Sequence, residues 1–418
     1  MSERKELSFL QALAIGLGNI IGAGIFVMAG ASVSAAGPAA ILAFLITALY
    51  ASTVGLNSAE LSSAFPKVEG GVYSFALLTL GETLGFLVGF FRVVSYSISG
   101  AATALGFSGY LTSVVPVPQW EYFAIALALI LVLGFIESRG LRLASEIETA
   151  LVILDVVGLL AFSLGVIALV GFKPENFSPF VPNGVQGVLT ASNIAFFAYS
   201  GFNTIATLTP SVKNGERVVP RAIVASLLIS AGLYMLVVFS MVDGLYFTAY
   251  GTTSSPMSLV LSSVKAPLPL VYFVDAVAIL ANVSVTLSII IAAERTAKQM
   301  AEDGLLPKEF ARHSTLVVTA MMAVSLALGN VEAIALVSNF GTVFSYMLSG
   351  VEVWVVRRRK VTHSFSSPGF PVVQAISVAA SGLFLFSLGE ESLEIGAVTL
   401  LVGLVVHALY KEVRARRL

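Results

Sequence analysis

The first apolar stretch of the chain, residues 16–30, reads GLGNIIGAGIFVMAG. It is apolar enough to form a membrane-spanning helix, but five glycines interrupt it: Gly16, Gly18, Gly22, Gly24 and Gly30. Each glycine weakens a helix by about 1 kcal/mol relative to alanine. We therefore expect a membrane span whose helix breaks at residues 22–24, while the other glycines allow close packing of neighbouring helices.

The composition of the whole chain supports a membrane protein. Of 418 residues, 57% are hydrophobic and 11% are charged, and the mean hydropathy is +0.93. A soluble domain carries about 25% charged residues, so lipid must be the solvent of this chain. The net charge of −1 argues against a nucleic-acid partner.

The sequence lacks residues and motifs that several classes of protein require. The chain has no cysteine, and its three histidines lie near expected helix ends: His313, His363 and His407. The GxxxxGK[ST] loop of ATP-driven proteins is also absent from the sequence. We therefore expect neither an enzyme, nor a metal cluster, nor an ATP-driven pump.

The hydropathy pattern predicts an all-α polytopic protein. A span needs about 20 mostly apolar residues, and we expect about twelve: 8–35, 38–65, 83–114, 119–136, 144–171, 185–211, 220–243, 269–294, 315–329, 331–356, 370–388 and 390–410. Short connections favour a single transmembrane domain over residues 1–418. Within it we expect one repeat at about 8–171, a second at about 185–356 and two extra helices at about 370–410.

The positions of Lys and Arg predict the orientation in the membrane, because cytoplasmic loops carry an excess of both residues. With the N-terminus inside, 20 of the 23 Lys and Arg fall on the cytoplasmic side. Only Lys173 and Lys265 fall outside, and Arg92 lies within a span. We therefore expect a multi-pass protein of the cell membrane with both termini in the cytoplasm.

A second interruption lies in the sixth span, which contains FFAYSGFNTIATLTP at residues 196–210, with Ser200 and Gly201 at its middle. Matching interruptions in two halves of a polytopic protein indicate the binding site of a transporter. Broken helices expose amides that suit a carboxylate and carbonyls that suit an ammonium group. An α-amino acid carries both groups. The alternative is that these glycines serve helix packing alone.

Four motifs in order resemble the amino acid–polyamine–organocation (APC) superfamily of transporters. GNIIGAGIF at 18–26 is similar to GxxIGxGIF, and AELSSAFPKVEGGVYSF at 59–75 is similar to AELxxxxPxxGGxYxY. The two others are FFAYSGFNTIATLTPSVKNGERVVPRAI at 196–223 and AERTAKQMAEDGLLPKEFAR at 293–312. The resemblance implies the LeuT-like inverted five-helix repeat, spans 1–5 and 6–10 with discontinuous helices 1 and 6, that the superfamily shares with sodium-coupled neurotransmitter transporters.

The resemblance also implies the roles of individual residues. Amides around Ala23 and Gly24 would hold the substrate carboxylate, break carbonyls would hold its amino group, and Phe197 would cover it. The expected substrate-binding residues are Ile20, Gly22, Ala23, Gly24, Phe197, Ala198, Ser200, Gly201 and Asn203. Two positions depart from the family pattern: Asn203 stands where members often have an acidic residue, and Arg92 where they often have an apolar or aromatic one.

Ionisable residues inside spans need a reason, since a charge at mid-bilayer costs at least about 2.5–3.5 kcal/mol. Asp155 lies near the middle of the fifth span, with Glu148 two turns earlier on the same face. Asp155 could bind Na⁺ together with Ser284 and Ser288 of the eighth span, because hard cations take oxygen ligands. It could instead carry a proton, or pair with Arg92.

Two further acidic residues lie within or at the ends of predicted spans. Glu60, at the inner end of the second span, is expected to brace the structure. Asp275 lies nearer the outer face, where it could attract ions or cationic substrates.

The expected function is an ion-coupled symporter of small or medium neutral amino acids, working by alternating access. A neutral substrate is expected because the sequence places no charged side chain beside either interruption. A polyamine or organocation permease, an uncoupled amino acid exchanger and a passive channel stay open as alternatives. We expect the bilayer and the substrate as partners, and no cofactor other than Na⁺ or H⁺ as coupling ion.

Overall fold

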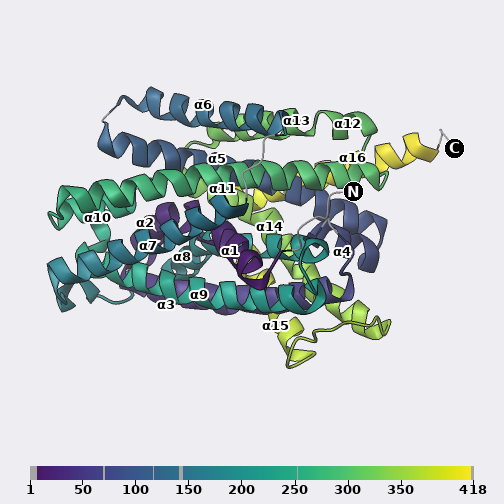
Figure 1. Ribbon diagram of the computed structural model, residues 1–418, viewed down its shortest axis with the longest axis horizontal. Helices are drawn as coiled ribbons and strands as arrows, with labels where there is room; N and C mark the ends of the chain where they lie inside the picture. Colours follow the sequence, from purple (N-terminus) through teal and green to yellow (C-terminus); the bar gives the residue numbers. More distant parts are fainter. Residues whose placement is uncertain (1–6, 69–70, 116, 141–144, 252, 416–418) are drawn as a thin grey trace.

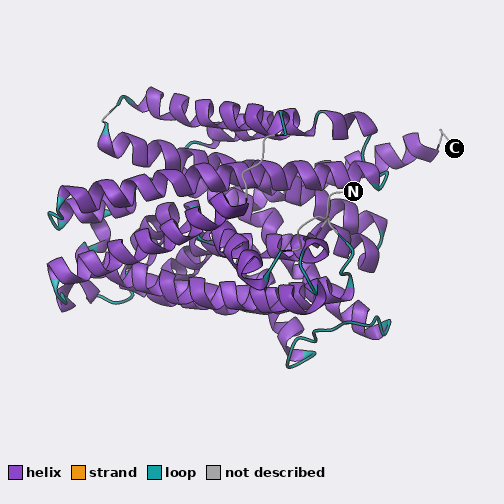
Figure 2. Ribbon diagram, viewed as in Figure 1, coloured by secondary structure: helices purple, strands orange, loops and turns teal. Residues whose placement is uncertain are grey.

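The computed structural model describes residues 7–68, 71–115, 117–140, 145–251 and 253–415. Over these residues the chain forms helices joined by loops, and Figure 2 shows no strand in them. Eight helical segments of the described residues are long and apolar enough to cross a membrane, and four shorter apolar helices accompany them. The prediction of an all-α polytopic protein with about twelve spans is confirmed.

The helices follow the predicted spans closely. The longer ones are α1 Phe9–Ile20, α2 Ala23–Ala36, α3 Ala40–Ala64, α5 Glu82–Val114, α6 Gln119–Ser138, α7 Ser145–Val170, α8 Gly184–Tyr199, α9 Gly215–Gly244, α11 Leu268–Glu302, α13 Ser314–Ser325, α14 Val331–Arg358, α15 Val372–Phe386 and α16 Glu390–Ala415. Short 3₁₀ turns are η1 Gly37–Ala39, η2 Pro174–Phe177, η4 Phe247–Ala249 and η5 Leu326–Leu328.

Three helices lie where the hydropathy pattern indicated loops: α4 Gly71–Leu80, α10 Pro256–Ser263 and α12 Lys308–Arg312. These helices are too short to cross a bilayer. A hydropathy pattern read for apolar runs of about 20 residues therefore does not detect these three helices. Residues 69–70, which belong to the motif at the end of the second span, lie outside the described residues.

The first span is broken between Ile20, the last residue of α1, and Ala23, the first residue of α2. Gly22 is the N-cap residue of α2 and supplies no side-chain hydrogen bond to it. Gly24 was expected within the break but lies in the first turn of α2. A Cβ at Gly24 would collide with the backbone of Ala198, so this glycine serves the close approach of two helices.

The sixth span changes helix type instead of unwinding. α8 ends at Tyr199, and the chain continues as a 3₁₀ helix, η3 Ser200–Ser211. A 3₁₀ run of this length is uncommon and often marks a hinge or a strained sequence. Gly201 is needed here because a Cβ would collide with the carbonyl oxygen of Asn19, at the end of α1.

The two interrupted helices pack against each other along their whole length and run in opposite directions. α2 packs against α8, and α1 against η3. Gly24 faces Ala198 beside the breaks, whereas at the far end of the pair Asn183 Nδ2 donates to the Ala35 carbonyl (2.8 Å). Antiparallel packing therefore places the two interruptions side by side at the middle of the molecule.

The other long helices of the two halves also pair. α3 packs against α9, α5 against α11 and α6 against α13. Figure 1 shows α5 and α11 side by side in the upper part of the bundle, and α3 and α9 together in the lower part. Each pair joins a helix of the first predicted repeat to the corresponding helix of the second. α15 and α16 pack on the outside of α14.

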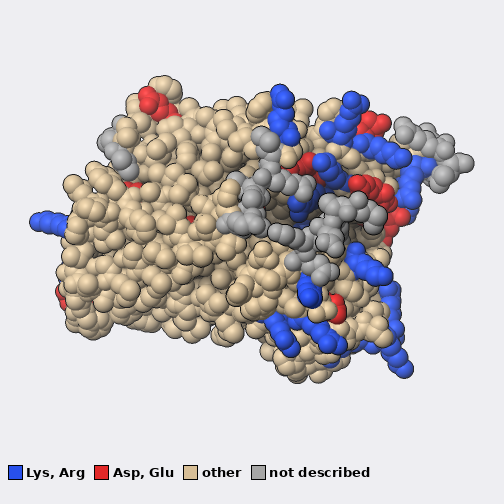
Figure 3. All heavy atoms as spheres, in the orientation of Figure 1, with Lys and Arg blue, Asp and Glu red and all other residues tan. Residues whose placement is uncertain are grey.

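Charge is distributed unevenly between the two ends of the bundle. On the face shown in Figure 3, Lys and Arg gather near α4, α12 and the end of α16, which we call the basic end. The opposite end, around α10, is nearly free of them on that face. Between these ends the same face shows few charged side chains, as a surface in contact with lipid requires.

Candidate substrate site

A cavity of about 50 Å³ lies where the two interruptions meet. It is lined by Asn19, Ile20, Gly22 and Gly24 from α1, α2 and their junction; Arg92, Tyr96, Ser99 and Thr103 of α5; Phe197, Ser200, Gly201 and Thr204 of α8 and η3; Val285, Ser288, Ile289 and Ala292 of α11; and Ser338, Asn339 and Thr342 of α14. This volume holds a few water molecules. An amino acid would therefore require the lining to open.

One wall of the cavity is the N-terminus of α2. Gly22 and Gly24 line the cavity, and no side chain caps the helix end at Gly22. The first amides of a helix lack intrahelical acceptors and carry a partial positive charge. Such an end is a ready site for a carboxylate.

Carbonyls of both breaks already accept hydrogen bonds from tyrosines. The Tyr234 hydroxyl of α9 contacts both the Ile20 oxygen (2.6 Å) and the Ala198 oxygen (3.1 Å). The Tyr346 hydroxyl of α14 donates to the Ser200 oxygen (2.7 Å). A carbonyl oxygen has two lone pairs, so each could still accept from a substrate ammonium group.

The remaining predicted residues divide into lining and supporting ones. Phe197 and Gly201 line the cavity, whereas Ala198 and Asn203 are not among its lining residues. Asn203 is buried, and its Oδ1 accepts a hydrogen bond from Ser58 of α3 (2.5 Å). Asn203 therefore connects η3 to α3.

Arg92 lies in the cavity wall, although we expected no charged side chain beside the breaks. Arg92, Tyr96, Ser99 and Thr103 follow at helical spacing, so one face of α5 turns toward the cavity. The guanidinium carbon lies 4.1 Å from the centre of the Tyr96 ring and 5.6 Å from that of Tyr346. Sequence could not reveal this, because hydropathy does not say which face of a span is turned inward.

Arg92 also does not form the ion pair that we considered for it. Among the described residues it pairs with no carboxylate, neither Asp155 nor Glu148. Its polar contact is a hydrogen bond to the Tyr96 hydroxyl.

The residues expected to bind a coupling ion are only partly brought together. Ser288 lines the cavity, whereas Ser284 and Asp155 are not among the lining residues. Asp155 is 4% exposed, and its Oδ1 has no hydrogen-bond partner among the described residues. Its helix, α7, packs against α1 and α9.

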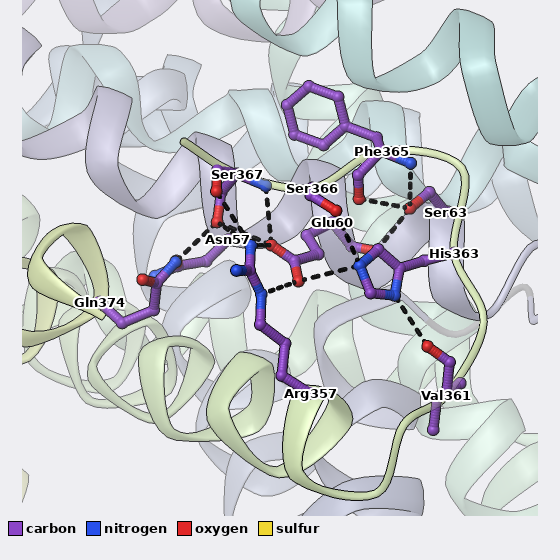
Figure 4. Close-up of polar contacts among 10 residues, drawn as sticks. All are labelled: Asn57, Glu60, Ser63, Arg357, Val361, His363, Phe365, Ser366, Ser367 and Gln374. Atoms are coloured by element: carbon purple, nitrogen blue, oxygen red, sulfur yellow. Dashed lines mark hydrogen bonds and ion pairs between the residues drawn. The ribbon is translucent and has the colours of Figure 1, made fainter. Parts of the chain in front are cut away.

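Glu60 lies away from the cavity in a fully paired cluster, drawn in Figure 4. Both of its oxygens contact Arg357 of α14, at 2.7 and 2.8 Å. The amide and hydroxyl of Ser367 also donate to it, at 2.8 and 2.7 Å. Glu60 is fully buried, so this cluster ties α3 to α14 and to the segment before α15, as expected for a bracing residue.

Asp275 lies toward the end of the molecule that carries α10. Its Oδ2 accepts hydrogen bonds from Ser258 of α10 (3.2 Å) and Ser113 of α5 (3.4 Å). It is 2% exposed, so it joins these two helices and does not face an open vestibule.

Two interrupted antiparallel helices around a central cavity with polar and apolar lining residues, within an apolar bundle, define a membrane transporter. Comparison with protein families agrees, since the model of the family described as "Amino acid permease" matches residues 7–399. The chain belongs to this family, within the APC superfamily.

Curated relatives cover nearly the whole chain. The branched-chain amino acid permease BcaP of Bacillus subtilis is 30% identical over 438 residues, covering 98% of this chain and 93% of the relative. The methylthioribose transporter of the same organism is 30% identical over 435 residues, covering 97% and 93%. Mouse cationic amino acid transporter 4 is 30% identical over 407 residues, covering 88% and 63%.

Proposed function

We propose that this protein is an ion-coupled secondary transporter that moves an amino acid across the cell membrane by alternating access. The observation that carries the proposal is the pairing of two helix interruptions around one cavity. The uncapped amides of α2 would hold the substrate carboxylate. The oxygens of Ile20 and Ser200, both of which line the cavity, would hold its ammonium group.

The transport movement would be a rocking of one group of helices against the rest. The moving group comprises α1, α2, α3, α8, η3 and α9, which carry both interruptions and their paired neighbours. α3 runs antiparallel to α9, since Gly55 lies against Leu227 and Phe44 against Tyr234. α5 runs antiparallel to α11, since Gly89 lies against Met300 and Ser113 against Asp275. Both pairings support the predicted division into two inverted halves. The basic end would face the cytoplasm, with both termini on that side.

Asp155 would couple transport to an ion, and we favour a proton over Na⁺. A buried carboxylate without a hydrogen-bond partner is costly, and protonation removes its charge. Na⁺ would need several oxygen ligands at once. No hydrogen bond joins Asp155 to Ser284 or Ser288 in the described part of the chain. Asp155 lies on α7, which packs against α1 and α9, so a change in its charge would act close to the helix that ends at the first break.

The test is uptake of radiolabelled amino acids into proteoliposomes under an imposed H⁺ or Na⁺ gradient. We expect saturable uptake of at least one amino acid, stimulated by the H⁺ gradient alone. Methylthioribose belongs in the panel because a relative carries that name. Stimulation by the Na⁺ gradient alone would show that the coupling ion is Na⁺ and not a proton. Amino acid exchange that needs neither gradient would show that the protein is an uncoupled exchanger. Uptake of none of the amino acids would refute the proposal.

Asp155→Asn tests the coupling residue. We expect the variant to bind substrate but to lose the stimulation of uptake by the gradient, because an amide cannot exchange a proton. Asp275→Asn is the matched control, since Asp275 is also buried with an unpartnered Oδ1 in the described structure but contacts neither break. If the gradient still stimulated uptake by the Asp155→Asn variant, Asp155 would have no role in coupling.

A further inference from the structure

We propose that Arg92 binds a second anionic group of the substrate, so that the central cavity takes acidic amino acids. This inference rests on the proposed function and names the substrate class of the same site. It replaces the expectation of a neutral substrate, which assumed that no basic side chain lies beside the breaks.

The first observation is a buried cation without a counter-ion. Arg92 is 3% exposed and forms no ion pair with any described residue. Its neighbours are the rings of Tyr96 and Tyr346, which interact favourably with a cation but carry no charge to balance it. Buried charges are normally paired, so the missing anion is expected from outside the chain.

The second observation is that Arg92 faces the cavity and lies close to the sixth-span break. It is the only Lys, Arg, Asp or Glu among the described lining residues. Tyr346, whose ring lies 5.6 Å from the guanidinium carbon, donates its hydroxyl hydrogen to the Ser200 oxygen. One tyrosine therefore separates Arg92 from a carbonyl proposed to hold the substrate ammonium group.

The chemistry of the lining fits a dicarboxylate with one ammonium group. The amides of α2 suit the α-carboxylate, and the guanidinium of Arg92 suits a second carboxylate, which it can bind through two parallel hydrogen bonds. Ser99 and Thr342 also line the cavity, but their hydroxyls donate to the carbonyls of Tyr96 and Ser338 on their own helices, so Arg92 is the donor that this proposal assigns to the second carboxylate. A cationic side chain in this position would meet an unshielded like charge, so lysine and arginine would be excluded.

The first experiment uses the unmodified protein, purified in detergent, and measures Kd by isothermal titration calorimetry. Aspartate is compared with asparagine, and glutamate with glutamine, because each pair has nearly the same shape and differs by one charge. We expect the acids to bind about 10- to 100-fold more tightly than their amides, as for a hydrogen bond between charged partners. Lysine should not compete. Amides that bind as tightly as the acids would overturn the inference.

The second experiment asks whether Arg92 causes this preference. Arg92→Gln should bring the Kd ratio of acid to amide close to one, and Arg92→Lys should give an intermediate ratio, since it keeps the charge and loses the planar fork. Arg139→Gln is the matched control: Arg139 also stacks on an aromatic ring, Phe135 at 4.9 Å, but lies at the end of α6. A ratio unchanged in Arg92→Gln would overturn the assignment. If that variant does not fold, the unmodified protein still decides the substrate class.

These outcomes separate the two proposals. Binding and uptake of neutral amino acids, without preference for acids, would refute the role of Arg92 and leave the amino acid transporter standing. Failure of acidic, neutral and basic amino acids alike would refute the proposed function itself.

Discussion

Tyr234 connects the two interrupted helices through a single hydroxyl. We expect Tyr234→Phe to slow substrate uptake by about tenfold, equivalent to about 1.4 kcal/mol. It should also destabilise the protein by about 1–3 kcal/mol. The reason is that the Ile20 and Ala198 carbonyls both lose a hydrogen-bond contact. Uptake kinetics and the thermal unfolding midpoint check the two effects.

Tyr199 provides the control for that substitution. It is also fully buried, its ring lies 5.0 Å from that of Tyr234, and its hydroxyl has no hydrogen-bond partner among the described residues. Tyr199→Phe should leave stability unchanged or slightly improved, because a buried polar group without a partner is removed. Equal losses in both variants would show that ring packing, and not the bridging hydroxyl, matters.

At the scale of single residues, the sequence reveals backbone positions better than side-chain partners. Gly22, Gly24 and Gly201 could be identified because glycine interrupts an apolar run, and all three line the cavity. Tyr234 and Arg92 could not be assigned a role. Nothing in an apolar span tells which of its residues meets a carbonyl on a helix far away in the chain.

The packing of α2 on α8 depends on the lack of a side chain at Gly24. We expect Gly24→Ala to destabilise the protein by about 1–3 kcal/mol, as overpacking does, and to abolish uptake. The added Cβ would meet the backbone of Ala198, which cannot turn away as a side chain could. Thermal unfolding and uptake of the same preparation measure the two effects.

Gly232 of α9 is the matched glycine. A Cβ there meets nothing within 4 Å, and the residue lies inside a helix. Gly232→Ala should therefore stabilise the protein by up to about 1 kcal/mol through helix propensity. If Gly24→Ala also stabilised the protein, α2 and α8 could not lie as close together at Gly24 as the structure places them.

The Glu60–Arg357 pair links α3, in the proposed moving group, to α14, outside it. We expect Arg357→Met to lower stability by about 3–5 kcal/mol, since it leaves the fully buried Glu60 carboxylate without its cation. Glu60→Gln should lower stability less, because the Arg357 side chain is 22% exposed. The double variant should be less destabilised than the two losses together. Thermal unfolding of the four proteins gives the coupling energy.

Arg359, two residues after Arg357, is exposed and donates one hydrogen bond to the Leu78 oxygen (3.2 Å). Arg359→Met should have little effect on stability. Additive losses from Glu60→Gln and Arg357→Met would show that the pair does not act as a unit.

At the scale of elements, apolar runs predicted the positions of the spans, because each long helix must cross the same thickness of lipid. The same rule explains the elements that were missed. α4, α10 and α12 do not cross the bilayer, and no local pattern shows the 3₁₀ form of η3, which packs against α1 and α9.

At the scale of the whole molecule, two sequence features anticipate the arrangement of the bundle. The matched interruptions in spans 1 and 6 led us to expect a binding site where they meet, and the structure packs these two spans against each other in opposite directions, with the cavity between the interruptions. The concentration of Lys and Arg in alternate loops anticipated one basic end (Figure 3). Neither feature shows which helices meet, because lipid-facing and buried apolar residues look alike in hydropathy.

The orientation of the bundle in the membrane is open to a direct test, because the chain contains no cysteine. Lys265→Cys places a single thiol at the end that carries α10, whereas Lys213→Cys and Lys308→Cys place one after η3 and at the start of α12. All three lysines are exposed.

In intact cells we expect a membrane-impermeant maleimide to label Lys265→Cys alone, because the basic end should face the cytoplasm. Lys213→Cys and Lys308→Cys should become labelled once the cells are permeabilised, and the unmodified protein should stay unlabelled throughout. Labelling in the reverse pattern would place the basic end outside. α2 would then extend from the break toward the cytoplasm, so the substrate carboxylate would be held on the cytoplasmic side of the break and not on the outer side.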